Sequence, residues 1–265
     1  MQAYLAGFYG AGNMGGALAQ AACRAVSPER VAVTCSTPEH TQAAADRLGC
    51  HAVSADRLIA DSKFVFLGIK PQMLEKAAPQ LQAAVAASDC VLVSMLAGVS
   101  LAALEAYFPG KRILRIMPNT PCAVGSGMML LCRGTLATQE DAAAFCELMR
   151  ESGRIDELPE RLIDAASAVA GCGPAFAYMF AQALADGGVA CGLPRAKAQE
   201  YAAQMLLGSA KLVLEGGTHP EALKDAVCSP GGSTIAGVRA LEAAGFRSAA
   251  MEAVLAAYEK TKKLV

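Results

Sequence analysis

The chain has 265 residues, of which 54% are hydrophobic and 18% are charged, and its formal net charge at pH 7 is −1. This composition excludes a disordered chain, because it supplies ample apolar material for a core. The near-neutral charge argues against a nucleic-acid partner, since phosphate binding needs clustered lysine and arginine. We therefore expect a folded protein of one large or two modest domains.

The N-terminal residues predict a strand, a tight turn and a helix. The apolar segment 5–9 precedes the pattern Gly10-x-Gly12-x-x-Gly15, and an alanine-rich helical segment follows. In a dinucleotide-binding unit the first glycine allows the turn, the second lets the backbone approach a pyrophosphate, and the third lets the helix pack on the strand. The N–H groups at the helix start would face the phosphates. The alternative is a glycine-rich turn that binds nothing.

The end of the second predicted strand, at residues 31–35, bears on the choice of cofactor. NAD-type sites carry a carboxylate about 20 residues beyond the glycine turn, where it binds the ribose 2′-hydroxyl. Here that place holds Ser36 and Thr37. No acid is present to repel a 2′-phosphate and two hydroxyls could donate to one, so the pattern favours NADPH, although no arginine follows Ser36. The alternative is that Ser36 and Thr37 only form a turn before Pro38.

Three more apolar segments predict strands, at residues 64–69, 91–94 and 113–117, and residues 128–131 and 155–158 are expected to form later strands. The first three end in small or polar residues, which suits a ligand crevice at the carboxyl ends of parallel strands. Pro71 stops the first of them, so we place Lys70 at this edge of the sheet. The alternative is a lysine that marks only the exit of the strand into water.

Beyond Pro159 the sequence predicts helices alone, at residues 161–170, 174–190, 195–215, 220–227, 234–244 and 248–264. We therefore predict an α/β fold, in which an N-terminal Rossmann-type dinucleotide-binding domain (residues 1–159) is followed by an all-α dimerisation domain (residues 160–265). The first helix of the second domain should pack directly on the sheet. A helical half this apolar would leave surface exposed as a monomer, and dimerisation would bury it. A monomeric alanine-rich bundle is the alternative.

The uncharged stretch 165–185 is long enough to cross a bilayer, but it is poor in leucine and a Gly-Pro pair interrupts it. We expect a helix buried by protein on all sides instead, with no membrane partner. The N-terminal stretch lacks the basic residues of a signal peptide. The ten cysteines show no CxxC spacing, which indicates neither a metal site nor a disulfide framework. Together these features predict a cytoplasmic protein.

A second site is predicted at residues 227–237, which contain Ser229-Pro230-Gly231-Gly232-Ser233-Thr234. The proline and the two glycines predict a tight turn, Ser233 is a suitable N-cap, and Thr234 would open the next helix. Free N–H groups at that helix start could bind a carboxylate, and three hydroxyls would point into the same small volume. The alternative is an ordinary capped turn between helices.

Ten short motifs, in order and over nearly the whole chain, resemble those of the Δ1-pyrroline-5-carboxylate reductase family. They lie at residues 10–15, 67–71, 117–121, 171–176, 186–189, 192–195, 219–220, 223–225, 229–235 and 245–247. The resemblance implies NADPH as cofactor, with NADH as an alternative, and an imino acid as substrate. It implies cofactor binding by Gly10, Ala11, Gly12, Asn13, Met14, Ser36, Ile69, Lys70, Pro71 and Ala97. It implies substrate binding by Glu160, Ser229, Gly232, Ser233 and Thr234.

The resemblance also implies that the C-terminal helices interlock two subunits, with the active site at their interface, and that dimers can assemble into decamers. The sequence departs from many relatives at Ala55, where they have asparagine near the cofactor ribose, and in lacking an arginine after Ser36. These departures leave the ratio of NADPH to NADH use open.

The implied reaction is hydride transfer to the C=N carbon of a cyclic imine, whose nitrogen must gain or already carry a proton. Neither motif contains a histidine, so a conventional general acid is not evident. We assign the catalytic role to Thr234, whose hydroxyl would hydrogen-bond the ring nitrogen. The N–H groups of residues 232–234 would hold the carboxylate and orient the ring against the cofactor, which carries the hydride chemistry itself.

Two other functions fit the same scaffold. A β-hydroxyacid dehydrogenase shares the N-terminal fold, but that family needs a lysine early in the helical domain, and residues 171–178 contain none. An NADP-sensing protein without enzymatic activity is the other alternative, since fold does not fix function. The intact loop 229–234 argues against it.

Overall fold

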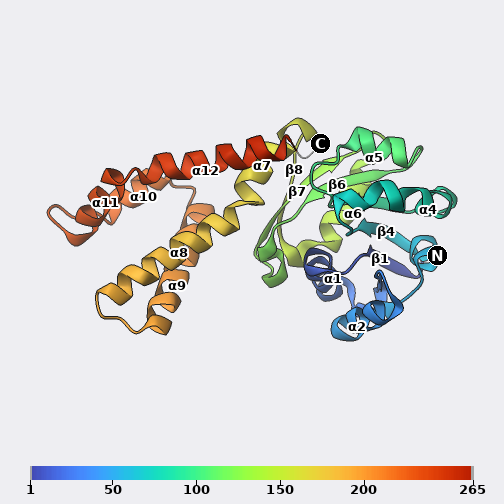
Figure 1. Cartoon of the computed structure of the whole chain (residues 1–265), viewed down its shortest axis with the longest axis horizontal. Coiled ribbons are helices and arrows are strands. Elements are labelled where there is room, and N and C mark those ends of the chain that lie inside the picture. Colours follow the sequence, from blue (N-terminus) through green and yellow to red (C-terminus); the bar gives the residue numbers. More distant parts are fainter. Residues whose placement is uncertain (1, 264–265) are drawn as a thin grey trace. The chain divides into compact units, whose positions relative to one another are not determined.

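The computed structural model describes residues 2–263, and its N-terminal part is built on a mostly parallel eight-stranded sheet (Figure 1). The strands are β1 (Tyr4–Tyr9), β2 (Val31–Thr34), β3 (His51–Ala52), β4 (Ser62–Leu67), β5 (Val91–Ser94), β6 (Ile113–Met117), β7 (Gly127–Arg133) and β8 (Gly153–Glu157). Their order is β3-β2-β1-β4-β5-β6-β7-β8, so the chain changes direction across the sheet between β1 and β4. In open α/β sheets ligands bind at such a switch point, outside the carboxyl ends of the strands.

Helices cover both faces of the sheet, and each face has its own apolar core. α1 (Asn13–Val26), α2 (Pro38–Leu48) and α6 (Gln139–Leu148) pack on one face, where the rings of Phe8 and Phe66 stack with their centroids 4.2 Å apart. α3 (Ala55–Asp61), α4 (Leu74–Ala87) and α5 (Leu101–Tyr107) pack on the other face. Strands covered on both faces need apolar residues throughout, which is why they were visible as continuous apolar segments.

The seven predicted strands are confirmed, and the structure adds two features that the sequence did not indicate. β3 is an edge strand of two residues, too short to form an apolar segment. β7 runs antiparallel to β6, with Leu131 opposite Ile116, whereas the other neighbouring strands of the described chain pair in parallel. The direction of a pairing depends on the path of the connecting chain, and a local sequence pattern does not record that path.

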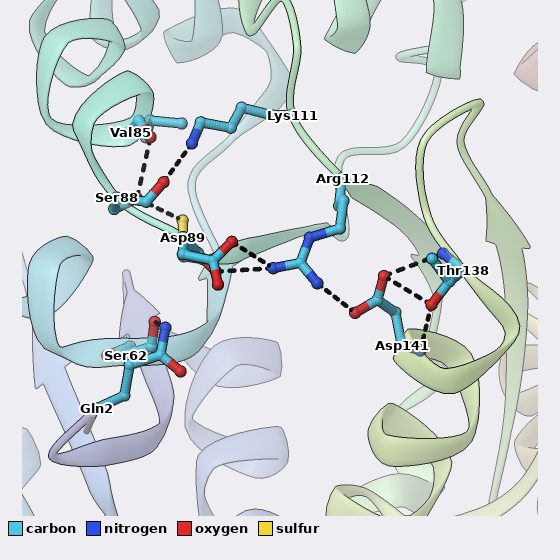
Figure 2. A network of polar contacts seen from close by, with 10 residues as sticks. Gln2, Ser62, Val85, Ser88, Asp89, Lys111, Arg112, Thr138 and Asp141 are labelled. Atoms are coloured by element: carbon cyan, nitrogen blue, oxygen red, sulfur yellow. Dashed lines mark hydrogen bonds and ion pairs between the residues drawn. The ribbon is translucent and has the colours of Figure 1, made fainter.

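At the amino ends of β5 and β6 a polar network joins three elements (Figure 2). Arg112 donates from Nη2 to Asp89 Oδ1 over 2.8 Å and from Nη1 to Asp141 Oδ1 over 2.9 Å. Asp141 is buried, and it also completes a capping box with Thr138 at the start of α6. Because ligands bind at the opposite edge of such sheets, this network serves the stability of the fold.

The first helix after Pro159 packs on the sheet, as predicted. This helix, α7 (Ile163–Ala170), places Ile163 fully buried in the second core. The chain forms two compact units, of which one comprises the residues up to Cys172 and from Ala257 onward, and the other is Gly173–Ala256. Packing thus groups residues 160–172 with the sheet, although the predicted helical domain begins at residue 160.

The helical unit contains α8 (Gly173–Ala190), α9 (Arg195–Gly216), α10 (Pro220–Ala226), α11 (Ser233–Ala243) and most of α12 (Phe246–Thr261). α8 and α9 pack together through Ala185, Ala198 and Ala202. A Cβ atom at Gly188 would lie 3.3 Å from the Cβ of Ala198, so small residues let the two helices approach closely. The helices predicted beyond Pro159 are confirmed, each within about three residues of its predicted ends, except that the last predicted end, at residue 264, lies outside the described residues.

The expectation that the uncharged stretch is buried on all sides is wrong for a single chain. By length and composition alone, Glu160–Ala190 could cross a membrane: its most apolar window has a mean hydropathy of 1.3, and 11% of that window is buried. Large apolar residues on α8 are exposed, among them Met179 at 74%. One chain therefore leaves much of this stretch exposed, although Ser167, Ala168 and Ala185 are buried.

The ten cysteines are free thiols. Cys23, Cys90 and Cys132 are buried, whereas Cys146 is half-buried. Burial raises the pKa of the Cys132 thiol to about 11, so this side chain stays a neutral thiol at physiological pH.

Candidate dinucleotide and substrate sites

The glycine turn follows β1 and packs against the residues at the carboxyl end of β4. Gly10 has a φ of +103°, which favours glycine, and its N–H donates to the carbonyl oxygen of Thr34 on β2. A Cβ atom at Gly10 would lie 2.5 Å from the carbonyl oxygen of Gly68, and one at Gly15 would lie 2.2 Å from the carbonyl oxygen of Gly10. The turn is therefore as tight as the sequence predicts.

Gly12 differs from these glycines, because a Cβ atom there would meet no atom within 4 Å. It is the N-cap residue of α1, and no side chain caps the helix. The open space over Gly12 lets a ligand approach the backbone. The N–H groups of the first turn remain available for the phosphates of that ligand.

A pocket of about 580 Å³ opens at this turn, at the switch point of the sheet. It is lined by Gly10, Ala11, Gly12, Cys35, Ser36, His40, Ala43, Ala44, Arg47, Gly68, Ile69, Lys70 and Met73. Six of the ten residues predicted to bind a cofactor thus lie together. Of the others, Asn13 and Met14 form the first turn of α1, Pro71 follows Lys70, and Ala97 follows β5.

The charge of this pocket suits a phosphate-bearing ligand. Lys70, Arg47 and His40 line it, and none of its described lining residues is acidic. Its volume is within the range of small-molecule sites, about 300–1,000 Å³. The open approach to Gly12, the uncapped helix start and the basic lining together fit a dinucleotide.

The two hydroxyls at the end of β2 have different roles. Ser36 lines the pocket, as predicted for a cofactor-binding residue. Thr37 instead caps α2, where its Oγ1 accepts from the N–H of His40 over 3.2 Å, and it lines a neighbouring hollow. The cap uses an acceptor position of the Thr37 hydroxyl and holds its side chain at the start of α2, so the expectation that Thr37 donates to a 2′-phosphate stays a prediction.

Sequence reasoning missed the two pocket residues on α2, His40 and Arg47. They stand seven positions apart, with two alanines between them at positions 43 and 44 that also line the pocket. This spacing places all four on one face of a helix. The signal was present in the sequence, but only the packing of α2 shows that this face turns toward the glycine turn.

Glu160 lies in an ion-pair cluster under α7. Its Oε1 accepts from Arg115 Nη1 and from the N–H of Leu101, each over 2.6 Å. Arg115 is 4% exposed and lies 3.5 Å from Asp164 through its Nη2. Glu160 thus connects β6, α5 and α7, and losing one partner of such a buried pair strands the other charge. Its assignment to the substrate stays a prediction.

Asn119, in the motif at residues 117–121, also has structural partners. Its Nδ2 donates to the carbonyl oxygen of Ala170 over 3.0 Å, and its Oδ1 accepts from the N–H of Met128 over 3.0 Å. The side chain therefore ties the end of α7 to β7, and its amide group is largely occupied by the fold.

The loop 229–234 forms a tight turn before α11. Gly231 has a φ of +70°, and the N–H of Gly232 donates to the carbonyl oxygen of Ser229 over 3.0 Å. The helix begins at Ser233, so the N-cap is Gly232 and the prediction of Ser233 as N-cap is wrong by one residue. Gly232 takes the extended conformation that an N-cap requires, and no side chain caps α11. The first N–H groups of α11 thus remain available for an anion.

A charge network holds the elements around this loop. Arg247 lies 2.9 Å from Glu221 through Nη2 and 2.6 Å from Glu242 through Nε, and Lys224 lies 2.7 Å from Glu221. Lys224 and Arg247 keep the pKa of the Glu221 carboxyl below its usual range. The motifs at residues 223–225 and 245–247 therefore connect α10, α11 and α12 on both sides of the loop. Ser229, Ser233 and Thr234 are exposed in the single chain, and their substrate contacts stay predictions.

Comparisons with known proteins bear on both halves. The family described as pyrroline-5-carboxylate reductase dimerisation matches residues 160–264, and the family described as NADP oxidoreductase coenzyme F420-dependent matches residues 6–98. A pyrroline-5-carboxylate reductase of Pisum sativum is 40% identical over 263 residues, which are 98% of this chain and 96% of that protein. The enzyme of the same name from Escherichia coli is 40% identical over 262 residues, covering 97% of each chain.

Solved structures agree with these sequence relatives. The pyrroline carboxylate reductase of Plasmodium falciparum with NADP bound has a TM-score of 0.88 at 30% identity, and the alignment covers 99% of this chain and 98% of that one. A 1-pyrroline-5-carboxylate reductase from Streptococcus pyogenes has a TM-score of 0.85 at 32% identity, with 97% and 98% covered.

Proposed function

The chain belongs to the pyrroline-5-carboxylate reductase family, and from this premise we propose how its residues bring about the reaction. The protein is an NAD(P)H-dependent oxidoreductase that reduces the C=N bond of L-1-pyrroline-5-carboxylate and so gives L-proline, the last step of proline biosynthesis. This function is favoured over a β-hydroxyacid dehydrogenase and over an NADP-sensing protein, because the relatives that share nearly the whole chain are named pyrroline-5-carboxylate reductases.

The observation that carries the proposal is the basic pocket at the switch point of the sheet. When NADPH is bound there, it supplies the hydride. We assign its pyrophosphate to the N–H groups of residues 10–14 and its adenosine ribose to Ser36. Ile69, Lys70, Pro71 and Ala97 lie along the carboxyl ends of β4 and β5, and we assign them to the rest of the cofactor.

The substrate is assigned to the loop 229–234 and to Glu160. The uncapped start of α11 offers N–H groups of Ser233 and Thr234 to the substrate carboxylate, with Ser229 and Gly232 shaping the turn. The hydroxyl of Thr234 hydrogen-bonds the ring nitrogen and orients the imine. Glu160 has Oε1 committed to Arg115 and Leu101, so Oε2 is the oxygen that we assign to the substrate.

The protein self-associates through its helical half, which the dimerisation family matches. We propose a dimer as the working unit, with a decamer as the higher assembly. The exposed apolar residues of α8 and α9 support burial between copies, because surfaces of this kind are seldom left to water. We place the protein in the cytoplasm, where free cysteines persist, and without nucleic-acid or membrane partners.

The test is the decay of NADPH absorbance on adding L-1-pyrroline-5-carboxylate, repeated with NADH. We expect decay with NADPH, and absence of decay with either cofactor from protein that binds them would contradict the proposal. Thr234→Ala should lower turnover about 10- to 100-fold, as for loss of a hydrogen bond to a charged group, and leave NADPH binding unchanged. Thr234→Ser, which keeps the hydroxyl, should stay within about threefold of the unsubstituted enzyme. An equal loss of turnover and NADPH binding in Thr234→Ala would remove Thr234 from the reaction.

A further inference from the structure

One face of α2 forms a wall of the dinucleotide pocket. Its residues are His40, Ala43, Ala44 and Arg47, which all line the pocket. Ala43 and Ala44, in the middle of this face, have short side chains, and a basic side chain lies at each end of the face. A ligand group lying against the alanines would thus have the Arg47 guanidinium on one side and the His40 imidazole on the other.

Arg47 has donors to spare. It is exposed, and within residues 2–263 no carboxylate lies within ion-pair distance of its guanidinium. The adjacent Asp46 accepts from Gln42 Nε2 over 2.7 Å. A guanidinium offers a planar fork of N–H donors whose geometry matches a phosphate group.

The Arg47 guanidinium also lies close to α1. Its Nη2 is 2.9 Å from where a Cβ atom at Gly16 would stand, so the side chain reaches from α2 across to the first turns of α1. Glycine at position 16 leaves it that room. Arg47 thus lies beside the helix that receives the pyrophosphate, and it lines the same pocket as Ser36 at the end of β2, where the ribose 2′-position is recognised in this architecture.

The residues directly after β2 supply no cation of their own. Cys35 and Ser36 are neutral, and Thr37 is occupied as the N-cap of α2. We propose that Arg47, assisted by His40, binds the 2′-phosphate of NADPH and sets the preference of the enzyme for NADPH over NADH. The proposal rests on the proposed use of this pocket by the cofactor. It gives Arg47 on α2 the role of the arginine that is missing after Ser36.

The test measures binding by calorimetry on the full-length protein, without turnover. The probes are NADPH, NADH, adenosine 2′,5′-bisphosphate and adenosine 5′-monophosphate, the last two differing by the 2′-phosphate. The variants are Arg47→Gln, Arg47→Lys and His40→Gln. Arg57→Gln is the matched control, since Arg57 is an exposed arginine on α3, 3.4 Å from Asp61 and not a lining residue of the pocket.

Arg47→Gln should weaken NADPH and the bisphosphate about 10- to 100-fold, the size of a lost charge-assisted pair, and leave NADH and the monophosphate within about twofold. Arg47→Lys should fall between, because it keeps the charge and loses the fork. His40→Gln should show a smaller loss of the same selectivity, and Arg57→Gln none.

An equal loss for NADPH and NADH in Arg47→Gln would assign Arg47 to the shared pyrophosphate and overturn the proposal, as would no loss for either. If the unsubstituted protein bound neither dinucleotide, the cofactor role of the pocket would fail, and this inference with it. Binding of both dinucleotides with unchanged selectivity in Arg47→Gln would overturn the role of Arg47 alone.

Discussion

The sheet unit and the helical unit bury their apolar side chains to very different extents. In the sheet unit Phe8, Phe66 and Phe145 are fully buried, and two cores cover the two faces of the sheet. In the helical unit the buried apolar core consists of three alanines, while Met179 and Leu207 are 74% and 58% exposed. The first unit completes its core within one chain, and the second needs a further copy to complete its own.

The two units therefore have different roles in the proposed function. The sheet unit holds the dinucleotide pocket on elements that are rigid by their own packing. The helical unit carries the loop 229–234 on helices whose packing depends on assembly. Substitutions in the sheet core should therefore act at any protein concentration, whereas substitutions on the exposed helical faces should act through association.

The largest effect is expected in the sheet core. Phe66→Ala removes a fully buried ring that stacks on Phe8, and it should lower the free energy of unfolding by about 3–5 kcal/mol. Urea unfolding at two protein concentrations would measure it. The loss in the free energy of unfolding should be the same at both protein concentrations. A loss that disappears at the higher concentration would contradict the claim that the sheet unit completes its core within one chain.

The next effect is expected on α9. Leu207→Asp places a charge where we expect burial between copies, and it should cost the assembly about 2–3 kcal/mol, the value of a buried leucine. Sedimentation velocity would show the shift to smaller species. The matched control is Leu136→Asp in the sheet unit, where the leucine is 52% exposed, and it should leave the assembly intact. Equal dissociation by both variants would contradict the assignment.

A smaller effect is expected at the amino edge of the sheet. Arg112→Ala removes the links from Arg112 to Asp89 and Asp141 and should lower the free energy of unfolding by about 1–2 kcal/mol. The KM for NADPH should not change, because the pocket lies at the opposite edge of the sheet. Thermal unfolding measures the stability, and initial rates measure the KM for NADPH. A raised KM with unchanged stability would contradict the purely structural role of Arg112.

The smallest effect is expected from the charge network of the helical unit. Lys224 and Arg247 lower the pKa of the Glu221 carboxyl, so Glu221 stabilises this unit above the usual carboxyl pKa. That contribution is lost as the pH falls from the usual carboxyl pKa through the lowered one. Glu221→Gln should therefore lower the stability slightly near pH 7 and make no difference at low pH, where Glu221 is protonated, so the acid end of the stability curve becomes flatter. An equal loss at both pH values would contradict the electrostatic origin.

Much of this architecture could be predicted from local pattern. Apolar segments predicted six of the seven strands because those six are covered on both faces, whereas β8 is an edge strand without a buried residue. The glycine spacing predicted the turn because neighbouring backbone excludes a Cβ atom at Gly10 and Gly15. The antiparallel β7 was not predicted, because its direction follows from the path of the chain. The N-cap of α11 was displaced by one residue, because both Gly232 and Ser233 suit that position.

The site could be predicted only in part for a related reason. Gly12, Ser36 and Lys70 follow strands directly, so their place at the carboxyl edge could be read from the sequence. Arg47 lies in the last turn of α2, and its access to the pocket depends on how α2 packs beside α1. The partners of Glu160 are likewise distant in sequence, and a local pattern carries no record of them.

Sedimentation equilibrium of the full-length protein across a dilution series, with turnover measured on the same samples, tests whether the helical unit needs a second copy. We expect a dimer or a multiple of it at every concentration where the enzyme is active, with activity lost as the assembly dissociates. A folded and fully active monomer of 27.2 kDa would contradict this expectation, because the helical unit would then be complete without a second copy.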